Sequence, residues 1–549
     1  MLGVDERNRD VSSTNRTSIV DLSTMTRAPV NISRYWLFYL VLCTFAFSQD
    51  TANAGFRSLR IDAGRVIGEI RSFQGLNGPP SPVMAGLPNL VRQYKELRVN
   101  QVRTHDFMGP TEIDSQFSQN NALLTWLIPD SAQRSGVVKA GNASIIFPDW
   151  KADAEKPESY NFAATDNVLA TIHASGAEVY YRIGRSWGAQ SDPPPDFDKY
   201  ANVVKHIAMH YNLGWANGFH YNIRYWEFWN EPEALFWSGT PQEFYSLYEK
   251  TARALKSVDP TLKVGGDAKA IASDDGPYRE GLIDYCAAKH VPLDFYSWHT
   301  YALESADPYD AVRLAREIRG VLDTHGFPKA ESILSEWNLT PDFTEHERAR
   351  LQGVETAAFI GAVLSYLQDA PIDQAHFYRG DAAWMGLFDL DGRYFKTAYA
   401  FKAMGKMQET PQRLLVEGTD TFGFAALAGR ARDGRTIQIL ISNYAIPSGF
   451  EPNAMPMPAD VLKSAPVPDF SKFKFLPRRT DIVYRDNAGY NLTIDNLPWG
   501  KKAFHIKRYR ISKTQNFELV DEKESVGNSL SLSSPLVPEA MELVVLQRH

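Results

Sequence analysis

The chain has 549 residues, of which 44% are hydrophobic and 22% charged. This length allows two or three domains, and the apolar content excludes a disordered protein. The 58 Lys and Arg residues and 65 Asp and Glu residues give a net charge of -7 without basic runs, which argues against nucleic acid or an anionic membrane as a partner. The two cysteines exclude a disulfide framework.

An apolar run, YWLFYLVLCTFAF, occupies residues 35–47. It is shorter than the roughly 20 residues that span a bilayer as a helix, and two arginines precede it, so we interpret it as the core of a signal peptide. Small residues predict cleavage after Ala54, which makes 1–54 a signal segment, and Met25 is the expected true start because the leader is otherwise unusually long. An uncleaved anchor is the alternative. The mature protein is expected to be periplasmic or secreted, without stable membrane association.

Short β-rich runs then alternate with longer runs of helical pattern, which indicates a parallel sheet covered by helices. The predicted strands are residues 73–77, 101–105, 178–183, 224–229, 263–267, 294–299, 332–337 and 374–379. Eight strands close a (β/α)8 barrel, so the fold class is α/β, with a TIM barrel over 71–408.

Helical patterns occur at 241–258, 307–325 and 347–367. After about residue 409 the pattern changes to short alternating runs with turn signals, which predicts a C-terminal β-sandwich over 409–549. The segment 55–70 is strand-like, and we expect it to pair with that sandwich.

Catalytic groups of a barrel enzyme come from the carboxyl ends of its strands. The fourth strand ends in Trp-Asn-Glu-Pro at 229–232, and the seventh in Ser-Glu-Trp-Asn at 335–338, so Glu231 and Glu336 should face the same mouth. Pro232 is expected to hold Glu231 in an extended conformation. Two neighbouring carboxyls can divide the roles of acid and nucleophile in cleaving a glycosidic bond. The alternative for each glutamate is a structural pair with an arginine.

These two motifs resemble the acid/base and nucleophile motifs of retaining glycosidases with (β/α)8 barrels, and within that clan the chain most resembles glycoside hydrolase family 39. This family contains β-xylosidases and α-L-iduronidases. The supporting motifs, in chain order, are GLNG at 75–78, VRTHD at 102–106, YNF at 160–162, YRIG at 181–184, KVGG at 263–266 and SWHTY at 297–301. The resemblance covers roughly residues 55–549.

The resemblance implies that Glu231 is the general acid/base and Glu336 the nucleophile of a retaining enzyme, with carboxyl groups about 5 Å apart. It also implies that Asn230 binds the sugar 2-hydroxyl. Tyr301 and His299 are expected to orient Glu336 or to bind hydroxyl groups of the substrate.

Two further residues of the second strand belong to the expected substrate site. Arg103 and His105 should sit low in the mouth, where Arg103 could keep Glu336 ionised. A buried structural pair of these two residues is the alternative.

The end of the eighth strand departs from the family pattern because it carries Arg379, with Trp384 shortly after it. A cation in the sugar site could pair with the carboxylate of a uronic acid, whereas a neutral pentose needs no such partner. The alternative is a structural salt bridge from Arg379 to Asp381 or another acid at a strand end.

No cofactor or metal is expected, because the histidines show no zinc-type spacing and no glycine-rich phosphate loop occurs. His206 and His210 are interpreted as surface residues of a helix, and Cys286 as a buried structural thiol.

Three functions remain in view. The first is an exo-acting β-xylosidase of xylan degradation that releases xylose from xylo-oligosaccharides, with possible α-L-arabinosidase side activity. The second is a uronidase or exopolysaccharide-cleaving endoglycosidase of the same fold. The third is a non-catalytic glycan-binding protein, which the presence of both glutamates argues against. In each case the partner is an oligosaccharide or polysaccharide.

Overall fold

The structure is a computed structural model that describes residues 55–82, 87–105, 109–114, 118, 130–184, 192–234, 236–302, 306–340, 345–382, 385–448 and 472–548. The predicted signal segment 1–54 and Trp384 lie outside the described residues. Gly55–His549 form one compact unit. Within the described ranges, no helix has both the length and the apolar character needed to cross a bilayer.

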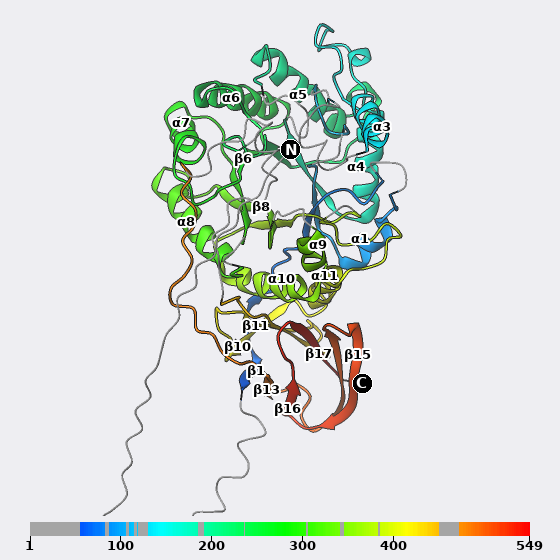
Figure 1. Cartoon of the computed structure of the whole chain (residues 1–549), viewed down its shortest axis with the longest axis vertical. Coiled ribbons are helices and arrows are strands. Elements are labelled where there is room, and N and C mark those ends of the chain that lie inside the picture. Colours follow the sequence, from blue (N-terminus) through cyan, green and yellow to red (C-terminus); the bar gives the residue numbers. More distant parts are fainter. Residues whose placement is uncertain are drawn as a thin grey trace, which may run out of the picture. The chain divides into compact units, whose positions relative to one another are not determined.

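Eight parallel strands close the barrel that the sequence predicts (Figure 1). They are β2 (Gly75–Asn77), β3 (Gln101–Arg103), β4 (Glu178–Ile183), β5 (Tyr225–Phe228), β6 (Lys263–Lys269), β7 (Phe295–Tyr301), β8 (Glu331–Asn338) and β9 (Gln374–Phe377). Each strand pairs with the next in chain order, and β9 pairs back onto β2. Their carboxyl ends therefore meet at one mouth.

Helices surround the barrel. They are α1 (Val91–Leu97), α3 (Ser131–Asn142), α4 (Ala163–Ser175), α5 (Phe197–Leu213), α6 (Pro241–Val258), α7 (Leu282–Lys289), α8 (Asp310–Thr324), α9 (Glu345–Leu351), α10 (Val354–Tyr366) and α11 (Lys396–Met407), with short turns η1 (Pro157–Ser159), η2 (Trp215–Asn217), η3 (Pro277–Gly281) and η5 (Leu367–Asp369). Helix α6 begins as predicted, because Thr240 and Glu243 form a capping box ahead of Pro241.

The helix predicted over 347–367 is instead two helices, α9 and α10. Gly353 separates them with an extended ψ of -177° and serves as the N-cap of α10. The apolar pattern continues across this break, so periodicity alone could not reveal it.

His206 and His210 are not surface residues, which corrects the sequence interpretation. Both lie buried on α5, with 3% and 2% of their surfaces exposed. His210 Nε2 lies 3.0 Å from Asp166 Oδ1, and its ring stacks on Phe162. The acidic and aromatic side chains that cover the histidines come from α4 and the segment before it. The local sequence around α5 therefore does not reveal that the histidines are buried. Cys286 is a buried free thiol, as predicted.

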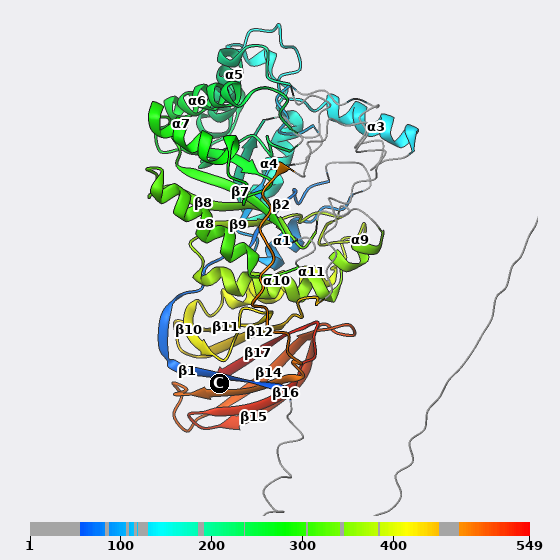
Figure 2. The same ribbon diagram turned by 60° about the vertical axis from the view of Figure 1, so that its left-hand side comes forward.

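The carboxy-terminal part forms one continuous nine-stranded sheet in the order β15-β14-β17-β12-β11-β10-β1-β13-β16 (Figure 2). Its strands are β1 (Phe56–Glu69), β10 (Gln412–Glu417), β11 (Phe424–Arg430), β12 (Thr436–Asn443), β13 (Gly489–Asp495), β14 (Ala503–Ile511), β15 (Asn516–Val526), β16 (Leu530–Pro535) and β17 (Ala540–Arg548). Strand β1 runs antiparallel to β10 and parallel to β13.

This sheet folds over its own core. Leu492 on β13 and Leu532 on β16 belong to the same buried cluster as Ile506 on β14 and Val544 on β17. We refer to this part as the β domain. It packs directly on the barrel, because Ser442 Oγ donates to the carbonyl of Ala358 in α10 at 2.6 Å.

Candidate active site

The two glutamates that the sequence singles out lie together at the barrel mouth. Glu336 is on β8, and Glu231 follows β5. A carboxylate oxygen of each and a ring nitrogen of His299 all lie within 4.8 Å of one another. The Glu336 side chain is 7% exposed and that of Glu231 is 18% exposed. The spacing matches the roughly 5 Å between carboxyl groups in retaining glycosidases, which leaves no room for a water molecule between the second carboxylate and the sugar.

The backbone at Glu231 is not extended, which corrects the expectation drawn from Pro232. Its φ is 45°, and that of Trp229 is 68°. Proline disfavours only the right-handed helical region for the residue before it, and here tertiary contacts select the left-handed region. The Glu231 N–H donates to the Ala268 carbonyl at 3.0 Å, and Trp229 presses so closely on Gly184 that a Cβ there would lie 2.9 Å from the indole. Such strain persists where surrounding contacts over-determine the conformation.

Arg103 is the centre of the hydrogen bonding below the two carboxylates. It is fully buried and donates to Glu336 Oε2 at 3.0 Å, to Glu227 Oε2 at 2.6 Å, and to the side-chain oxygens of Asn230 at 2.7 Å and Asn77 at 3.1 Å. Burial alone would lower the pKa of Arg103, but the charges of Glu227 and Glu336 outweigh it, so the pKa is raised. The guanidinium therefore stays charged and favours the ionised form of Glu336.

The arrangement around Arg103 also orients Asn230. Because Arg103 takes the amide oxygen, the amide nitrogen of Asn230 is left to act as a hydrogen-bond donor. A donor beside the Glu336 carboxylate is suited to binding a hydroxyl group.

His105 lies deeper in the mouth and is 3% exposed, with Nε2 3.8 Å from Glu336 Oε2. Burial first, and then the charges of Arg103 and Arg182, lower its pKa well below the usual value for histidine. It is therefore a neutral imidazole at neutral pH, and Arg103 rather than His105 supplies positive charge beside Glu336.

Tyr301 and His299 each contact a different one of the two carboxylates. The Tyr301 hydroxyl donates to Glu336 Oε1, so the Glu336 carboxylate is held from both sides by Tyr301 and Arg103. His299 instead contacts Glu231, with Nδ1 2.8 Å from Glu231 Oε1 and 3.9 Å from Glu336 Oε2. Burial lowers the pKa of His299 to about 4.

Glu227 and Asn77 are members of the site that residue-by-residue reasoning did not single out. Glu227 is fully buried in the middle of β5 and also accepts a hydrogen bond from Tyr180 at 3.1 Å. The signal for it was available, because an acidic residue inside an otherwise apolar strand needs a buried cation. Asn77, at the end of β2, donates to the Ser335 carbonyl at 3.0 Å and so ties β2 to β8, the strand that carries Glu336.

Arg379 forms a structural salt bridge with Asp381, which is one of the two alternatives that the sequence left open. Its Nε donates to Asp381 Oδ1 at 2.8 Å, and its Nη2 donates to Asp381 Oδ2, which makes a two-point salt bridge. Nη1 also contacts the hydroxyl of Tyr378 at 3.1 Å. The guanidinium is therefore already paired with a carboxylate from its own chain.

Glu231, His299 and Glu336 are also the one group in the described part of the chain that offers three close metal ligands. The surroundings do not suit a cation. Both oxygens of Glu336 already accept hydrogen bonds, one of them from the positively charged Arg103. A proton-transfer pair fits this environment and a metal ion does not.

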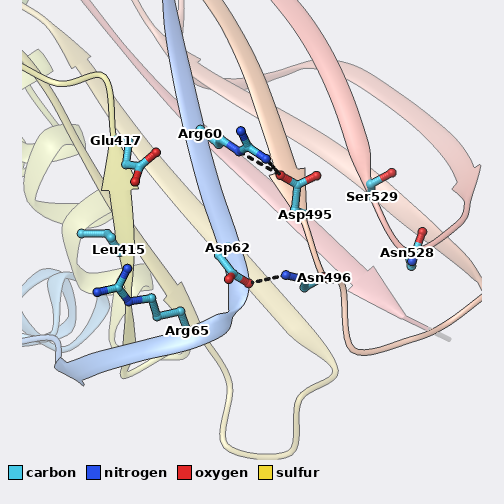
Figure 3. A pocket seen from close by; sticks show the side chains of 9 residues that line it. All are labelled: Arg60, Asp62, Arg65, Leu415, Glu417, Asp495, Asn496, Asn528 and Ser529. Atoms are coloured by element: carbon cyan, nitrogen blue, oxygen red, sulfur yellow. Dashed lines mark hydrogen bonds and ion pairs between the residues drawn. The ribbon is translucent and has the colours of Figure 1, made fainter.

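A separate cavity of about 550 Å³ lies on the β domain (Figure 3). Its charged groups are largely satisfied by one another: Arg60 pairs with Asp495 at 2.9 Å, and Asn496 donates to Asp62 at 2.9 Å. It has no counterpart to the paired carboxyls at the barrel mouth, so the chemistry is assigned to the mouth.

Comparisons with known proteins agree with this geometry. Residues 160–370, which include both carboxylates, match the model of the glycosyl hydrolases family 39. A solved glucosidase from Croceicoccus marinus is 34% identical, with a TM-score of 0.76 over 90% of this chain and 99% of that chain. The chain belongs to glycosyl hydrolase family 39.

Other relatives of this family 39 member include β-xylosidases. One from Geobacillus stearothermophilus is 28% identical over 254 residues, which is 40% of this chain and 48% of the relative. One from Caldicellulosiruptor saccharolyticus is 35% identical over 118 residues, which is 21% of this chain and 23% of the relative. The chain thus spans less than half the length of these curated relatives. A β-xylosidase from Caulobacter crescentus CB15 shares the fold, at 16% identity and a TM-score of 0.61 over 90% of this chain and 99% of that one.

Proposed function

We propose that this protein is a retaining glycoside hydrolase, and that its substrate is a β-xyloside. The observation that supports retention most directly is the spacing of the Glu231 and Glu336 carboxylates, whose nearest oxygens lie within 4.8 Å. Membership of a family of glycoside hydrolases supports the reaction class, and the β-xylosidases among the relatives support the sugar.

In the first step, an oxygen of Glu336 attacks the anomeric carbon while Glu231 gives its proton to the leaving oxygen. The C–O bond to the aglycone breaks, and a glycosyl ester of Glu336 forms. Arg103 and Tyr301 hold the two oxygens of Glu336 and keep the carboxylate ionised and aimed at the sugar.

The neutral state of His299 suits the acid role of Glu231. An imidazolium at 2.8 Å would stabilise the Glu231 carboxylate and oppose its protonation, whereas burial lowers the pKa of His299 to about 4 and removes that charge. With its proton on Nδ1, His299 donates to Oε1 and leaves the catalytic proton to Oε2 of Glu231.

In the second step, Glu231 acts as a base. It takes a proton from water, the water oxygen attacks the anomeric carbon, and the ester bond to Glu336 breaks. Two successive inversions give net retention. The Asn230 amide, oriented by Arg103, is placed to donate to the 2-hydroxyl as charge develops at the neighbouring carbon.

The choice of sugar has two candidates. A neutral pentose fits a site in which Arg379 is already paired with Asp381, and this pairing weighs against a uronic acid. A β-glucoside is the second candidate, because the Croceicoccus marinus relative is a glucosidase. Exo action on xylo-oligosaccharides and an α-L-arabinosidase side activity complete the xylosidase proposal.

A panel of nitrophenyl glycosides tests these candidates. We expect the β-xyloside to be hydrolysed with the highest kcat/KM, followed by the α-L-arabinoside, and the glucuronide and iduronide to be inert. A higher kcat/KM for the β-glucoside would move the assignment to a glucosidase. Hydrolysis of none of the glycosides, including polymeric xylan, would instead favour a glycan-binding protein.

The first products of xylohexaose hydrolysis test the mode of action. An exo-acting enzyme releases xylose and xylopentaose first, whereas an endo-acting enzyme gives xylobiose, xylotriose and xylotetraose, and nuclear magnetic resonance of the newly formed sugar should show the β-anomer before mutarotation. Initial appearance of the α-anomer would contradict retention and with it the role of Glu336 as nucleophile.

We also propose that the protein is exported and cleaved after Ala54. The support is the apolar run 35–47 with arginines before it and small residues after it. Amino-terminal sequencing of the protein recovered outside the cytoplasm should begin at Gly55. A sequence that begins before the apolar run would contradict cleavage.

A further inference from the structure

A buried lysine lies at the carboxyl end of β6, next to the loop that carries the acid/base. Lys269 is only 1% exposed, and its Nζ lies 3.5 Å from Glu233 Oε1 and 3.4 Å from Asp274 Oδ2. Asp267 is buried near them, and burial raises the pKa of its carboxyl well above the usual range. Glu233 and Asp274 lie within ion-pair distance of Lys269 and are its counter-ions.

This cluster is tied to Glu231 on both sides of Lys269. The Glu231 N–H donates to the carbonyl of Ala268 at 3.0 Å, and Oε1 of Glu233 accepts from the N–H of Ile271 at 3.0 Å. Glu233 follows Glu231 by two residues, so these contacts fix the backbone of the acid/base itself and the loop just after it. They hold Glu231 at its φ of 45°, a conformation that is unfavourable for a residue with a side chain.

The other end of the cluster belongs to the β domain. Residues 472–487, which we call the connecting segment, leave the β domain and run along the barrel past α8, as the orange trace in Figures 1 and 2 shows. The N–H of Lys474 donates to Asp274 Oδ1 at 2.9 Å, and Ser273 Oγ donates to the Lys474 carbonyl at 2.8 Å.

Further contacts fix the connecting segment on the barrel. Arg313 of α8 donates to the Pro477 carbonyl at 2.9 Å. Arg479 Nε donates to Asp307 at 2.6 Å, with side chains 9% and 0% exposed. These contacts hold the segment on the barrel. Asp274 lies between the segment and Lys269, with Oδ1 accepting from the Lys474 N–H and Oδ2 facing Lys269 Nζ.

We propose that the connecting segment of the β domain positions the acid/base Glu231 through Asp274, Lys269 and Glu233. Asp274 and Lys269 act as positioning residues, because neither touches the reacting atoms. The β domain is then part of the catalytic apparatus and not a separable module. This inference rests on the proposed role of Glu231 as acid/base, and its test is chosen so that the two can fail separately.

The test uses the leaving group of the substrate. A phenyl β-xyloside has a poor leaving group that needs the proton of Glu231, whereas a dinitrophenyl β-xyloside has a good one that departs without it. Because kcat/KM reports the first step alone, a defect in acid positioning lowers it for the poor leaving group only. A general structural defect lowers it for both.

Asp274→Asn in the full chain removes the charge that faces Lys269 and keeps an oxygen for the Lys474 N–H. We expect kcat/KM for the phenyl xyloside to fall about tenfold, and that for the dinitrophenyl xyloside to stay within about twofold, since misplacement of a catalytic group costs roughly 10- to 100-fold. Lys269→Met should give the same selective loss and serves if Asp274→Asn fails to fold.

Asp275→Asn is the matched control. Asp275 is the neighbouring acid, and its side chain is 59% exposed. Its contact with the connecting segment is an ion pair with Lys474 Nζ at 3.2 Å. Both substrates should be hydrolysed as by the wild type. The positioning role is overturned if Asp274→Asn and Lys269→Met lose kcat/KM equally on both substrates. It is also overturned if they lose none on either substrate. A wild type that hydrolyses neither substrate overturns the proposed function itself and the inference with it.

Discussion

Replacing Arg103 by methionine tests the electrostatic account of the site most severely. The guanidinium donates hydrogen bonds to four side chains. Its ion pair with Glu227 has an N–O distance of 2.6 Å, and both side chains are 0% exposed. Removing one partner of a buried ion pair costs about 3–5 kcal/mol, because the other charge stays in the core uncompensated. We expect the free energy of unfolding to fall by that amount, which is a large part of the roughly 5–15 kcal/mol of a typical domain.

The same change should impair the nucleophile. Without Arg103, Glu336 loses the cation that favours its ionised form and takes up a proton more readily, which removes its nucleophilicity. A loss of about 3 kcal/mol of transition-state stabilisation corresponds to roughly 100-fold in kcat/KM. Arg103→Lys keeps the charge but not the planar fork of donors, so its loss should be intermediate.

Urea unfolding and kcat/KM for an aryl xyloside measure both effects. The matched control is Arg98→Met, which removes an exposed salt bridge to Glu409 whose side chains are 44% and 37% exposed. That pair should contribute less than about 1 kcal/mol. The reasoning is refuted if the two methionine variants lose equal stability and Arg103→Met keeps its kcat/KM within about threefold of the wild type.

Three more results are expected. Glu336→Gly should lose essentially all turnover, and added azide should restore cleavage of an activated β-xyloside as the inverted α-azide; a normal rate without azide contradicts the nucleophile assignment. Glu231→Ala should retain cleavage of dinitrophenyl xyloside while losing about 10²–10⁴-fold on phenyl xyloside, and azide should here give the β-azide. The free energy of unfolding should fall as the pH drops from about 6.5 to 4, because burial lowers the pKa of His299 to about 4 and that of His376 to about 3. In this window unfolding takes up protons, so the two histidines contribute their full stabilisation only above it. The contribution is on the order of 3 kcal/mol for His299. The His376→Gln variant can keep a contact with Gln101, and calorimetry should show that its stability depends less steeply on pH than that of the wild type. An identical slope of stability against pH contradicts the account.

Much of the barrel could be predicted because its signals are local. Each of the eight strands is a short β-rich run between helical patterns, and each is present in the closed sheet. Glu231 and Glu336 could be named for the same reason, since both lie beside proline or tryptophan at recognisable strand ends. The parallel barrel topology then requires their side chains to meet at one mouth.

What could not be predicted depends on residues far apart in the chain. The backbone of Glu231 has a positive φ and donates to Ala268 of β6, although Pro232 suggested an extended backbone. His206 and His210 are buried because the segment around α4 covers them. The break between α9 and α10 leaves the apolar pattern intact, so only the folded helices reveal it.

The sequence by itself determined the fold class, the order of the strands and the two carboxylates, because periodicity and strand-end position depend on neighbours within a few residues. Only the tertiary structure decided the partners of the charged groups. Arg103 could have paired with His105 but holds Glu227 and Glu336, and Arg379 could have faced a substrate carboxylate but pairs with Asp381. Ion pairing depends on the distance between charged groups and on their burial in the folded protein. Neither quantity can be derived from the residues that are neighbours in the sequence.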